Sequence, residues 1–335
     1  MNPPTSPERL MQLGDAFKGA KALLSAVELG VFTALAEGPL DAAMLRGRIS
    51  IHERGARDFF DALVALKLLA RDEQGRYTNT AETAWYLDRG QPTYIGDSLE
   101  LRNARQFGPW DGLTEALRSG RPRSGARGSG NFGAYYSDPA VRDNVVKGMR
   151  VSLDAGTVIA AKFPWRSYRT FFDIGTGQGF LPVEIARAHS HLTGGGFDLP
   201  AVRALFDGYV AEHGLADRLK FVPGDFFADP LPRADVLVLG RVLHNWDLQS
   251  KNMLLSKAYD ALPEGGALIV YEKLIDDERR ENAQALLESL NMLVISAGGF
   301  DFSGADCIGW MRNVGFRDMR LEALTAGHAM VTGLK

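Results

Sequence analysis

A short run of closely spaced glycines constrains the fold of this 335-residue chain more than any other feature. Residues 171–179 read FFDIGTGQG, and residues 180–186 continue as FLPVEIA. The apolar start predicts a buried strand, and the continuation predicts a helix with Pro182 in its first turn, where the missing N–H has no helical partner. Glycines between a strand and a helix let the chain turn sharply and let a ligand approach main-chain atoms. We therefore expect a strand, a glycine loop and a helix that together bind a nucleotide-like ligand.

The spacing of these glycines distinguishes between such ligands. The dinucleotide fingerprint G-x-G-x-x-G would need a glycine at position 180, where this chain has Phe180. The run is instead D-x-G-x-G-x-G, which is the pattern of S-adenosylmethionine (SAM) binding. Its members are Asp173, Gly175, Gly177 and Gly179. A glycine turn alone is weak evidence, so the assignment depends on what the rest of the chain contains.

Composition limits the class of protein. With 45% hydrophobic and 24% charged residues, the chain is typical of globular proteins, and its length suggests two domains. The net charge of −3 predicts no general attraction to nucleic acid or to an anionic membrane. Cys307 is the only cysteine, which excludes intrachain disulfides and cysteine-cluster metal sites. No segment reaches transmembrane length and residues 1–9 lack an apolar signal core, so we expect a cytoplasmic protein.

The first third of the chain predicts three helical regions and a hairpin. Apolar residues recur at helical spacing over residues 7–37, 41–49 and 54–69, and residues 69–78 alternate around a glycine turn. This order is typical of a winged helix, a fold that often binds DNA. The candidate recognition helix at residues 54–63 mixes acidic and basic residues, which argues against DNA binding. Beyond it, residues 82–165 are mostly helical, apart from a Gly- and Arg-rich loop at residues 119–130.

From residue 168 onward, strand and helix patterns alternate, which predicts an α/β domain with a parallel sheet. Five polar residues stand where successive strands end: Asp173, Asp198, Asp225, His244 and Glu272. Because ligands of open α/β sheets bind outside the carboxyl ends of the strands, we expect these side chains on one edge. Asp198 also lies 19 residues after Gly179, the spacing at which a carboxylate meets a ribose diol. A helix capped by Ser303 and Asp306 and a hairpin of residues 319–323 and 330–334 would complete the domain.

With these residues identified, the chain resembles the SAM-dependent O-methyltransferases that act on plant phenolics and on bacterial aromatic polyketides and pigments. The resemblance covers essentially the whole chain and is most specific in residues 173–179, 197–200 (FDLP), 224–227 (GDFF) and 242–246 (VLHNW). It implies a winged-helix dimerisation domain at residues 1–105, a helical connector at 106–165 that contributes to the substrate pocket, and a Rossmann-like SAM-binding catalytic domain at 166–335. It also implies a homodimer formed through the N-terminal domain and a small aromatic substrate.

The resemblance further implies a role for individual residues. SAM would be held by Asp173, Gly175, Gly177, Gly179, Asp198, Leu199, Asp225, Phe226, Arg241 and Trp246. His244 would act as general base on the acceptor hydroxyl, oriented by Glu272 and Asp301, without a metal. The substrate pocket would draw on Phe132, Met149, Asn291, Met292 and Ile295.

Three positions depart from the family pattern and leave other functions open. Asn245 follows the histidine where the family usually has Asp, Gly240 stands where a lysine is common, and Asp301 stands where a glutamate is common. C- or N-methylation of a small aromatic or heterocyclic metabolite therefore remains an alternative to O-methylation. A second alternative is a SAM-sensing winged-helix regulator, and a third is a relative that has kept SAM but turned to other chemistry.

Overall fold

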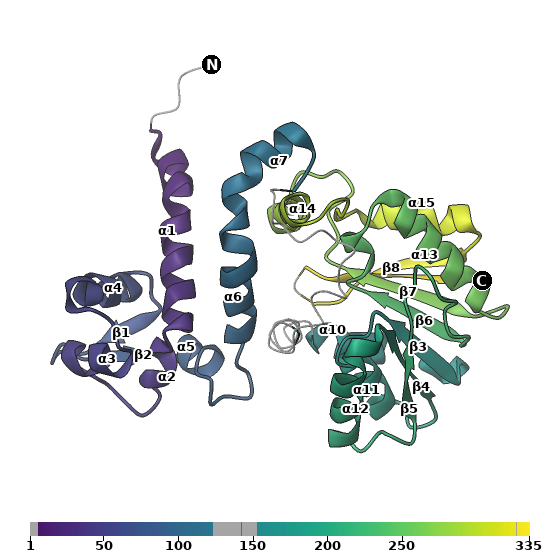
Figure 1. The fold of residues 1–335 in the computed structure, drawn as a ribbon, viewed down its shortest axis with the longest axis horizontal. Helices are drawn as coiled ribbons and strands as arrows, with labels where there is room; N and C mark the ends of the chain where they lie inside the picture. The colour runs from purple at the N-terminus through teal and green to yellow at the C-terminus, as the bar shows by residue number, and fades with distance from the viewer. Residues whose placement is uncertain (1–5, 123–141, 143–152, 326) are drawn as a thin grey trace. The chain divides into compact units, whose positions relative to one another are not determined.

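The computed structural model describes residues 6–122, 142, 153–325 and 327–335. The contacts between residues divide the chain into two units, and the boundary along the chain lies between Phe107 and Gly108 (Figure 1). The substrate-pocket residues Phe132 and Met149, and most of the predicted loop at residues 119–130, lie outside the described residues. The division into three parts at residues 105 and 165 stays a prediction.

The N-terminal unit is a set of short helices with one hairpin. Its elements are α1 (Glu8–Glu28), α2 (Val31–Ala34), α3 (Ala42–Arg48), α4 (Glu53–Ala65), β1 (Leu69–Arg71), β2 (Tyr77–Asn79), α5 (Ala81–Tyr86), α6 (Gly96–Arg102) and the π-turn η1 (Asn103–Phe107). The predicted order of three helical regions and a hairpin is confirmed, with α1 and α2 both in the first region, and Phe32, Phe60 and Leu63 lie fully buried in its core. The predicted helix at residues 54–69 is too long, because Lys67 takes a left-handed φ of 63° and turns the chain into β1.

The second unit contains the large sheet. After η2 (Pro109–Gly112) and α7 (Leu113–Ser119), its elements are α10 (Leu153–Lys162), η4 (Trp165–Ser167), β3 (Thr170–Ile174), α11 (Phe180–Ala188), β4 (Thr193–Asp198), η5 (Pro200–Val202), α12 (Arg203–Glu212), β5 (Leu219–Pro223), β6 (Val236–Gly240), η6 (Leu243–Asn245), α13 (Leu248–Ala261), β7 (Ala267–Glu272), α14 (Ala283–Ile295), α15 (Gly304–Val314), β8 (Arg317–Ala323) and β9 (Ala329–Leu334). The strand order is β5-β4-β3-β6-β7-β9-β8. Strands β3 to β7 are parallel, and the closing hairpin of β8 and β9 is antiparallel, as predicted.

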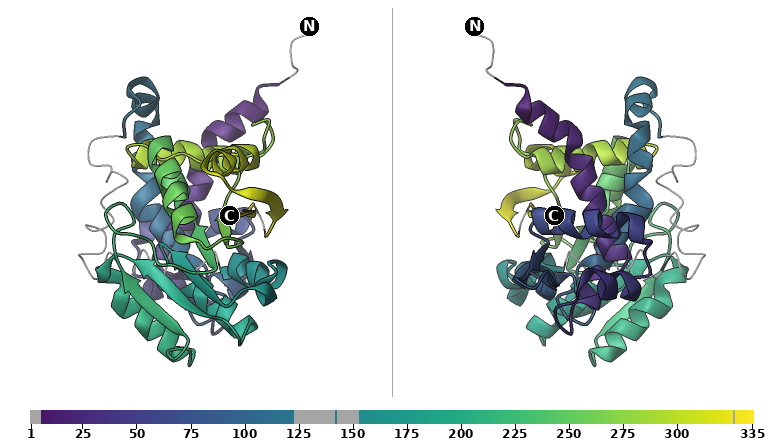
Figure 2. Two further views of the ribbon diagram at one scale, coloured as in Figure 1. Left: turned by 90° about the vertical axis from the view of Figure 1, so that its right-hand side faces the viewer. Right: turned by 90° about the vertical axis from the view of Figure 1, so that its left-hand side faces the viewer.

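Helices cover both faces of this sheet (Figures 1 and 2). Alternate residues of β6 separate to the two sides: Val236 and Val238 pack with α10, α11 and α12, whereas Leu237 and Leu239 pack with α13 and α15. A strand that is buried on both faces reads as a continuous apolar run, because successive side chains point to opposite faces. The predicted Rossmann-like fold class is confirmed.

The caps of two helices agree with the local sequence. Ser303 accepts a hydrogen bond from the backbone N–H of Asp306, and the Asp306 carboxylate accepts one from the Ser303 N–H, which completes the predicted capping box of α15. At the N-terminus, α1 begins after Pro7 and has no side-chain cap. The Ser6 hydroxyl accepts from the Glu8 N–H at 3.1 Å.

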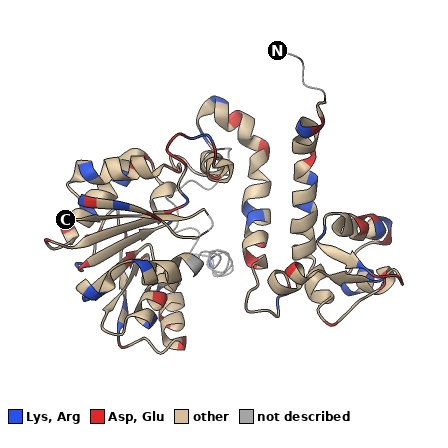
Figure 3. Cartoon of the chain, turned by 180° about the vertical axis from the view of Figure 1, so that it is seen from behind, with Lys and Arg blue, Asp and Glu red and all other residues tan. Residues whose placement is uncertain are grey.

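Charges of both signs lie on α4, the helix that would read DNA in a winged-helix regulator (Figure 3). Arg57 lies 3.8 Å from Asp61, and Asp61 also pairs with Arg71 of the hairpin at 2.7 Å. Within the described ranges, no helix is both long enough and apolar enough to cross a lipid bilayer.

Helix α1 generates a prediction about assembly. Leu10, Leu13 and Phe17 recur on one side of α1 and are 66%, 69% and 58% exposed in the single chain. Contiguous exposed apolar residues of this kind mark association surfaces, because water disfavours them. We expect light scattering at micromolar concentration to give a dimer and the double change L13E/F17E to give a monomer with an unchanged circular dichroism spectrum. Leu321→Glu, at a 46% exposed leucine of β8, is the control and stays dimeric. A monomeric wild-type protein contradicts the prediction.

Candidate active site

The glycine loop after β3 adopts a backbone that few other residues tolerate. Gly175, Gly177 and Gly179 have φ angles of 78°, 55° and 89°, and Gly179 is the residue that precedes α11. These values lie in the left-handed region, where an L side chain crowds its own backbone. The D-x-G-x-G-x-G spacing is therefore a requirement of this turn, and it leaves the loop free of side chains at each of the three positions.

Asp198 ties the end of β4 to the glycine loop. Its Oδ2 accepts a hydrogen bond from the Gly177 N–H at 2.8 Å, and its Oδ1 accepts one from the Leu199 N–H at 2.7 Å. A carboxylate has about four acceptor positions, so each oxygen keeps capacity for one further donor. Adjacent hydroxyls of a ribose are donors of the kind that this carboxylate can still accept, so the Asp198 side chain fits the ribose of SAM.

Burial changes the acidity of both aspartates at this point. It raises the pKa of Asp198 to about 6, against the opposing effect of the two backbone N–H groups. Burial likewise raises the pKa of Asp173, one strand away, to about 7, and the neighbouring charge of Asp198 adds to the shift. Near neutral pH, the sheet edge therefore holds two carboxyl groups that ionise less readily than exposed ones.

The turn after β5 presents aromatic rings. Asp225 Oδ1 accepts from the Phe227 N–H at 2.8 Å, and the Asp225 N–H donates to Asp229 at 2.8 Å. Trp246, which directly follows η6, meets both rings of this turn edge-on, with centroids 5.7 Å from Phe226 and 4.5 Å from Phe227. An aromatic wall of this kind suits a flat base such as adenine. Phe227 was missed from the sequence, although it belongs to the same GDFF segment as the two predicted residues.

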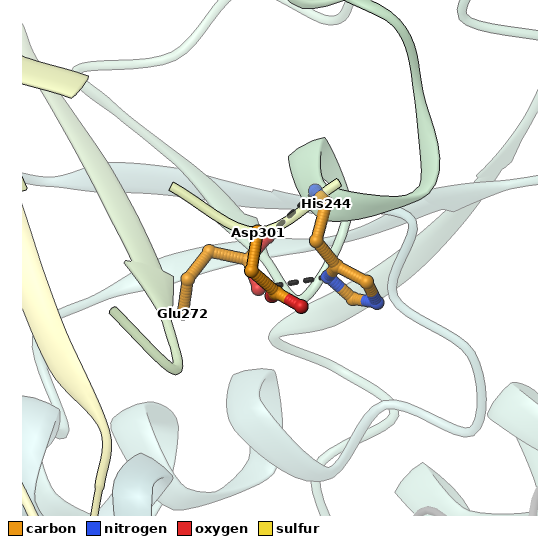
Figure 4. Close-up of side chains that lie close together, drawn as sticks. All are labelled: His244, Glu272 and Asp301. Carbon is orange, nitrogen blue, oxygen red and sulfur yellow. Dashed lines mark hydrogen bonds and ion pairs between the residues drawn. The ribbon is translucent and has the colours of Figure 1, made fainter. Parts of the chain in front are cut away.

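His244 and Glu272 form a buried hydrogen-bonded pair. His244 lies on η6 after β6, Glu272 is the last residue of β7, and β6 and β7 are neighbours in the sheet. His244 Nδ1 lies 2.8 Å from Glu272 Oε2, and the His244 backbone N–H donates to Oε1 at 3.3 Å (Figure 4). Two bonds from one residue to one carboxylate hold both the backbone and the ring of His244.

The charge of Glu272 determines which ring nitrogen of His244 carries hydrogen. Burial would raise the pKa of Glu272, but His244 and Arg241 outweigh it, so that the pKa lies below its ordinary value. An ionised carboxylate can only accept, so Nδ1 donates to it and the neutral ring keeps its lone pair on Nε2. The Nε2 atom points away from Glu272 and is the nitrogen that can take up a proton (Figure 4).

Asp301 completes the cluster from a third segment of chain. Its carboxylate lies within 4.8 Å of the ligand atoms of His244 and Glu272, and its Oδ1 is buried without a hydrogen-bond partner in the described part of the chain. Burial raises the pKa of Asp301 to about 6, with His244 opposing this shift and Glu272 adding to it. One imidazole and two carboxylates are also a possible metal-ligand set. The absence of a metal stays a prediction.

Close approach of the backbone brings Asp301 to this position. A Cβ added to Gly299 would lie 2.7 Å from the carbonyl oxygen of His244 and 2.9 Å from that of Asn245. Only glycine allows these two loops to come so near. The Asp301 N–H also donates to Ser289 Oγ of α14 at 3.2 Å. The paired glycines in AGGFD are the sequence signal for this contact.

The structure accounts for two departures from the family pattern. Asn245 Nδ2 donates to the carbonyl oxygens of Arg241 and Val242 at 3.2 and 3.3 Å, which an aspartate could not do. A Cβ added to Gly240 would lie 1.9 Å from the ring of buried Tyr271, so this ring fills the space of any side chain there. The Asp301 substitution for glutamate has no such explanation in the contacts.

Arg241 contacts the cluster of His244, Glu272 and Asp301 through Glu272. It is one of few non-glycine residues with a left-handed backbone, with φ of 56°, and its Nη1 lies 3.3 Å from Glu272 Oε2. A residue held in this region stores on the order of 1–3 kcal/mol of strain and usually has a reason to be there. Here the turn aims the guanidinium at Glu272. The predicted contact of Arg241 with SAM stays a prediction.

The predicted substrate residues of α14 lie beside the histidine turn. Helix α14 packs against η6, with Asn291 and Met292 buried and Ile295 half-buried. Trp110 Nε1 of η2 donates to Asn291 Oδ1 at 3.0 Å. This bond fixes the orientation of the Asn291 amide, and it connects the segment that follows the N-terminal unit to the candidate pocket.

The pKa of Asp173 yields a prediction about stability. The folded carboxyl keeps its proton up to about pH 7, whereas an ordinary one loses it near 3.8. The folded state therefore binds more protons in this window, and wild-type stability falls as pH rises through it. Asp173→Asn has no such loss, so its free energy of unfolding relative to wild type should rise by about 2–4 kcal/mol between pH 5 and pH 8.

Thermal or urea unfolding of ligand-free protein at the two pH values measures this difference. Asp217→Asn changes an exposed aspartate in the same unit and is the control, with no pH-dependent gain. An Asp173→Asn gain that is equal at both pH values would show that this carboxyl is not protonated in the folded state.

Comparison with known proteins identifies the family. Residues 11–89 match the O-methyltransferase dimerisation domain, and residues 110–317 match the O-methyltransferase domain. The chain is similar to the tetracenomycin polyketide synthesis 8-O-methyl transferase TcmO of Streptomyces glaucescens, with 41% identity over 98% of this chain and 97% of that protein. It is 37% identical to the N,N-dimethyltransferase OxyT of Streptomyces rimosus, covering 94% and 92% of the two chains.

A further relative and a solved structure agree with this. The 3-hydroxy-5-methyl-1-naphthoate 3-O-methyltransferase of Streptomyces sahachiroi is 34% identical over 98% of this chain and 95% of that protein. Human N-acetylserotonin methyltransferase in complex with SAM superimposes with a TM-score of 0.91 at 28% identity, covering 100% and 99% of the chains. The matched dimerisation domain supports a homodimer. The chain belongs to the SAM-dependent O-methyltransferase family, and SAM is its methyl donor.

Proposed function

We propose that this enzyme methylates a hydroxyl group of a small aromatic, polyketide-like molecule and that His244 is the general base. The observation that supports the base is the hydrogen bond of Nδ1 to ionised Glu272, which leaves Nε2 as the acceptor. The names of two relatives support the acceptor class, since one acts in polyketide synthesis and the other on a hydroxynaphthoate. We further propose that the reaction takes place in the cytoplasm and involves neither nucleic acid nor membrane.

The proposed chemistry divides between the donor and the residues of this chain. When bound, SAM supplies a methyl group that is already activated on a sulfonium. The chain must place the acceptor oxygen in line and remove its proton. Placement can lower the barrier by roughly 7–11 kcal/mol, and a positioned base typically adds a factor of about 10²–10⁴. His244 Nε2 takes the proton, and the imidazolium formed is stabilised by Glu272 at 2.8 Å and by the charge of Asp301.

The assignment of the SAM contacts is part of the proposal. Asp198 and Leu199 would hold the ribose, the loop of Gly175, Gly177 and Gly179 would contact the methionine part with Asp173 beneath it, and Asp225, Phe226, Arg241 and Trp246 would enclose the remainder. The left-handed loop, the Asp198 bridge and the three-ring wall support it.

The acceptor pocket is proposed to lie beside η6, where α14 carries Asn291, Met292 and Ile295. Asn291 is held by Trp110, which supports a role for residues 106–165 as a connector that shapes the pocket. Phe132 and Met149 remain proposed members outside the described residues. The N-terminal unit would then act in dimerisation rather than in chemistry.

N-methylation is the second candidate, because OxyT is an N,N-dimethyltransferase and is 37% identical to this chain. A neutral amine attacks through its lone pair before it loses a proton, so its methylation needs a general base much less than that of a phenol. The two candidates therefore differ in how strongly turnover depends on His244.

The ribose assignment leads to a binding prediction. Asp198→Ala removes a charged acceptor, which should weaken SAM binding by about 1.5–3 kcal/mol, the scale of a hydrogen bond to a charged group. Calorimetry with EDTA present measures it and tests metal independence in the wild type at the same time. Asp207→Ala, at a solvent-exposed aspartate of α12, is the control. Wild-type affinity in Asp198→Ala would place the ribose elsewhere.

His244→Ala is the direct test of the proposed base. Turnover of a phenolic acceptor should fall by about 10²–10⁴, mainly in kcat, while SAM affinity stays near wild type. Raising the pH toward the pKa of the acceptor should partly restore the rate, because solvent then supplies the anion. Glu272→Gln should show a milder loss, since the base remains without its orienting charge.

A labelled-methyl assay over a phenolic, indolic and amine panel, with product mass and position, gives these rates. His213→Ala is the control, because His213 contacts the Tyr209 carbonyl oxygen on α12 and lies on no strand end. Normal turnover of His244→Ala at neutral pH would exclude base catalysis by this residue and favour the amine acceptor.

A further inference from the structure

One fully buried lysine lies beneath the catalytic cluster and has no part in the chemistry described so far. Lys251 stands in the first turn of α13 and has 0% exposed surface, unlike every other lysine that the structure describes. Burying an ammonium group is unfavourable unless its hydrogens find acceptors. The surroundings of this side chain therefore show what its charge does.

The Lys251 ammonium finds three acceptors. Nζ donates to the carbonyl oxygen of Trp246 at 2.8 Å and to that of Phe300 at 2.9 Å, and it lies 3.0 Å from the centroid of the Phe300 ring. An ammonium has three N–H donors, which matches two carbonyls and one aromatic face. Burial lowers the pKa of Lys251 to about 7, while the charges of Glu272 and Asp301 oppose this shift.

The two carbonyls belong to different loops, and each is next to a residue of the cluster. Trp246 follows His244 by two residues, and Phe300 immediately precedes Asp301. The same two loops approach closely at Gly299, which faces the carbonyl oxygens of His244 and Asn245. Lys251 thus joins the histidine turn to the Asp301 loop from beneath, while its own side chain is enclosed and cannot reach a ligand.

We propose that Lys251 is a positioning residue for methyl transfer: it holds the Asp301 loop against the histidine turn so that the Asp301 carboxylate lies beside the His244 ring. This inference rests on the proposed role of His244 as base. Lys251 acts on kcat through Asp301, and of the residues proposed to contact SAM it holds only the main chain of Trp246.

A second lysine on the same helix makes the same kind of contact with the other half of the site. Lys257 Nζ donates to the carbonyl oxygens of Phe226 and Asp229, both at 2.6 Å, in the turn proposed to hold adenine. A third, Lys335, donates to the carbonyl oxygens of Tyr259 and Leu262 at the far end of α13, at 2.7 and 2.9 Å, and lies over the Tyr259 ring. The three lysines share donor chemistry and differ in the loop they hold.

The test replaces each lysine with methionine, which is of similar length and cannot donate. Lys251→Met should lower kcat about 10- to 100-fold, because a displacement of about 1 Å near the chemistry has an effect of this size. Its KM for SAM should stay within about threefold of wild type, because Lys251 holds only the main chain of Trp246 among the proposed SAM contacts. Lys257→Met should instead raise KM for SAM with kcat nearly unchanged. Lys335→Met should alter the melting temperature only.

A double-mutant cycle with Asp301→Asn separates positioning from general destabilisation. If Lys251 acts through Asp301, the double variant K251M/D301N should be no slower than the slower single variant, because residues that work as one unit are not additive. Independent losses that multiply, or a kcat of folded Lys251→Met within about threefold of wild type, overturn the proposal. SAM titration and circular dichroism establish folding of each variant.

If Lys251→Met does not fold, the cycle is run with Lys251→Gln, whose amide keeps two N–H donors. Coupling of this variant to Asp301→Asn supports the proposal, and additivity overturns it. The His244→Ala rate tests the base alone. A failed base assignment with intact coupling between positions 251 and 301 would leave Lys251 holding Asp301 for another role.

Discussion

Parallel pairing of four adjoining strands is the constraint on which the site depends. In the order β4-β3-β6-β7 every carboxyl end lies at one edge of the sheet. Residues that are up to 99 positions apart in the chain, such as Asp173 and Glu272, therefore lie at the same edge without any long-range sequence signal. The apolar strands that permit this are buried on both faces. The pairing of β6 with β7 places the histidine turn directly beside Glu272, and the bond between His244 and Glu272 follows from that adjacency.

The edge divides electrostatically into two halves. Asp173 on β3 and Asp198 on β4 are buried, and burial raises the pKa of both carboxyl groups. At Asp198, two backbone N–H groups oppose this shift by favouring the charged form. On β6 and β7, Glu272 is kept ionised by Arg241 and His244. The hydroxyl donors and the positive charge of a bound ligand would favour ionisation of Asp173 and Asp198, and an ionised Glu272 suits a histidine that takes up a proton. In the proposed mechanism, the same sheet edge would serve donor binding and proton removal side by side.

Helix α13 connects the two halves from below the edge. Its buried lysine holds the loops of His244 and Asp301, and a second lysine holds the turn of Phe226. Lysine reaches carbonyl oxygens that lie several ångströms from a helix axis, because its long side chain spans the gap and its ammonium offers three donors. A rigid element behind the loops of a site is a common way to keep functional groups within the small tolerances that chemistry needs.

Local pattern was enough to predict much of this protein. The glycine spacing predicted the tight turn after β3, because left-handed backbone at positions 175, 177 and 179 is a local requirement that only glycine meets readily. Alternation of apolar strands and helices predicted the sheet, and the resemblance named His244 and Glu272 as partners. The capping box at Ser303 and the final hairpin were equally local.

Other features became visible only in three dimensions. The sequence pattern predicted an end of α4 that was too late, because the left-handed turn falls on Lys67 and no glycine marks it. The contacts of Lys251, Gly299 and Gly240 could not be read from their neighbours, since each depends on a segment at least 31 residues away along the chain that folding brings within a few ångströms. The sequence by itself determined the elements and the chemistry of the edge, because those follow from residue type and period. Only tertiary packing decided which side chain holds which loop, because the role of a buried lysine or of a glycine depends on the atoms that surround it in the folded chain.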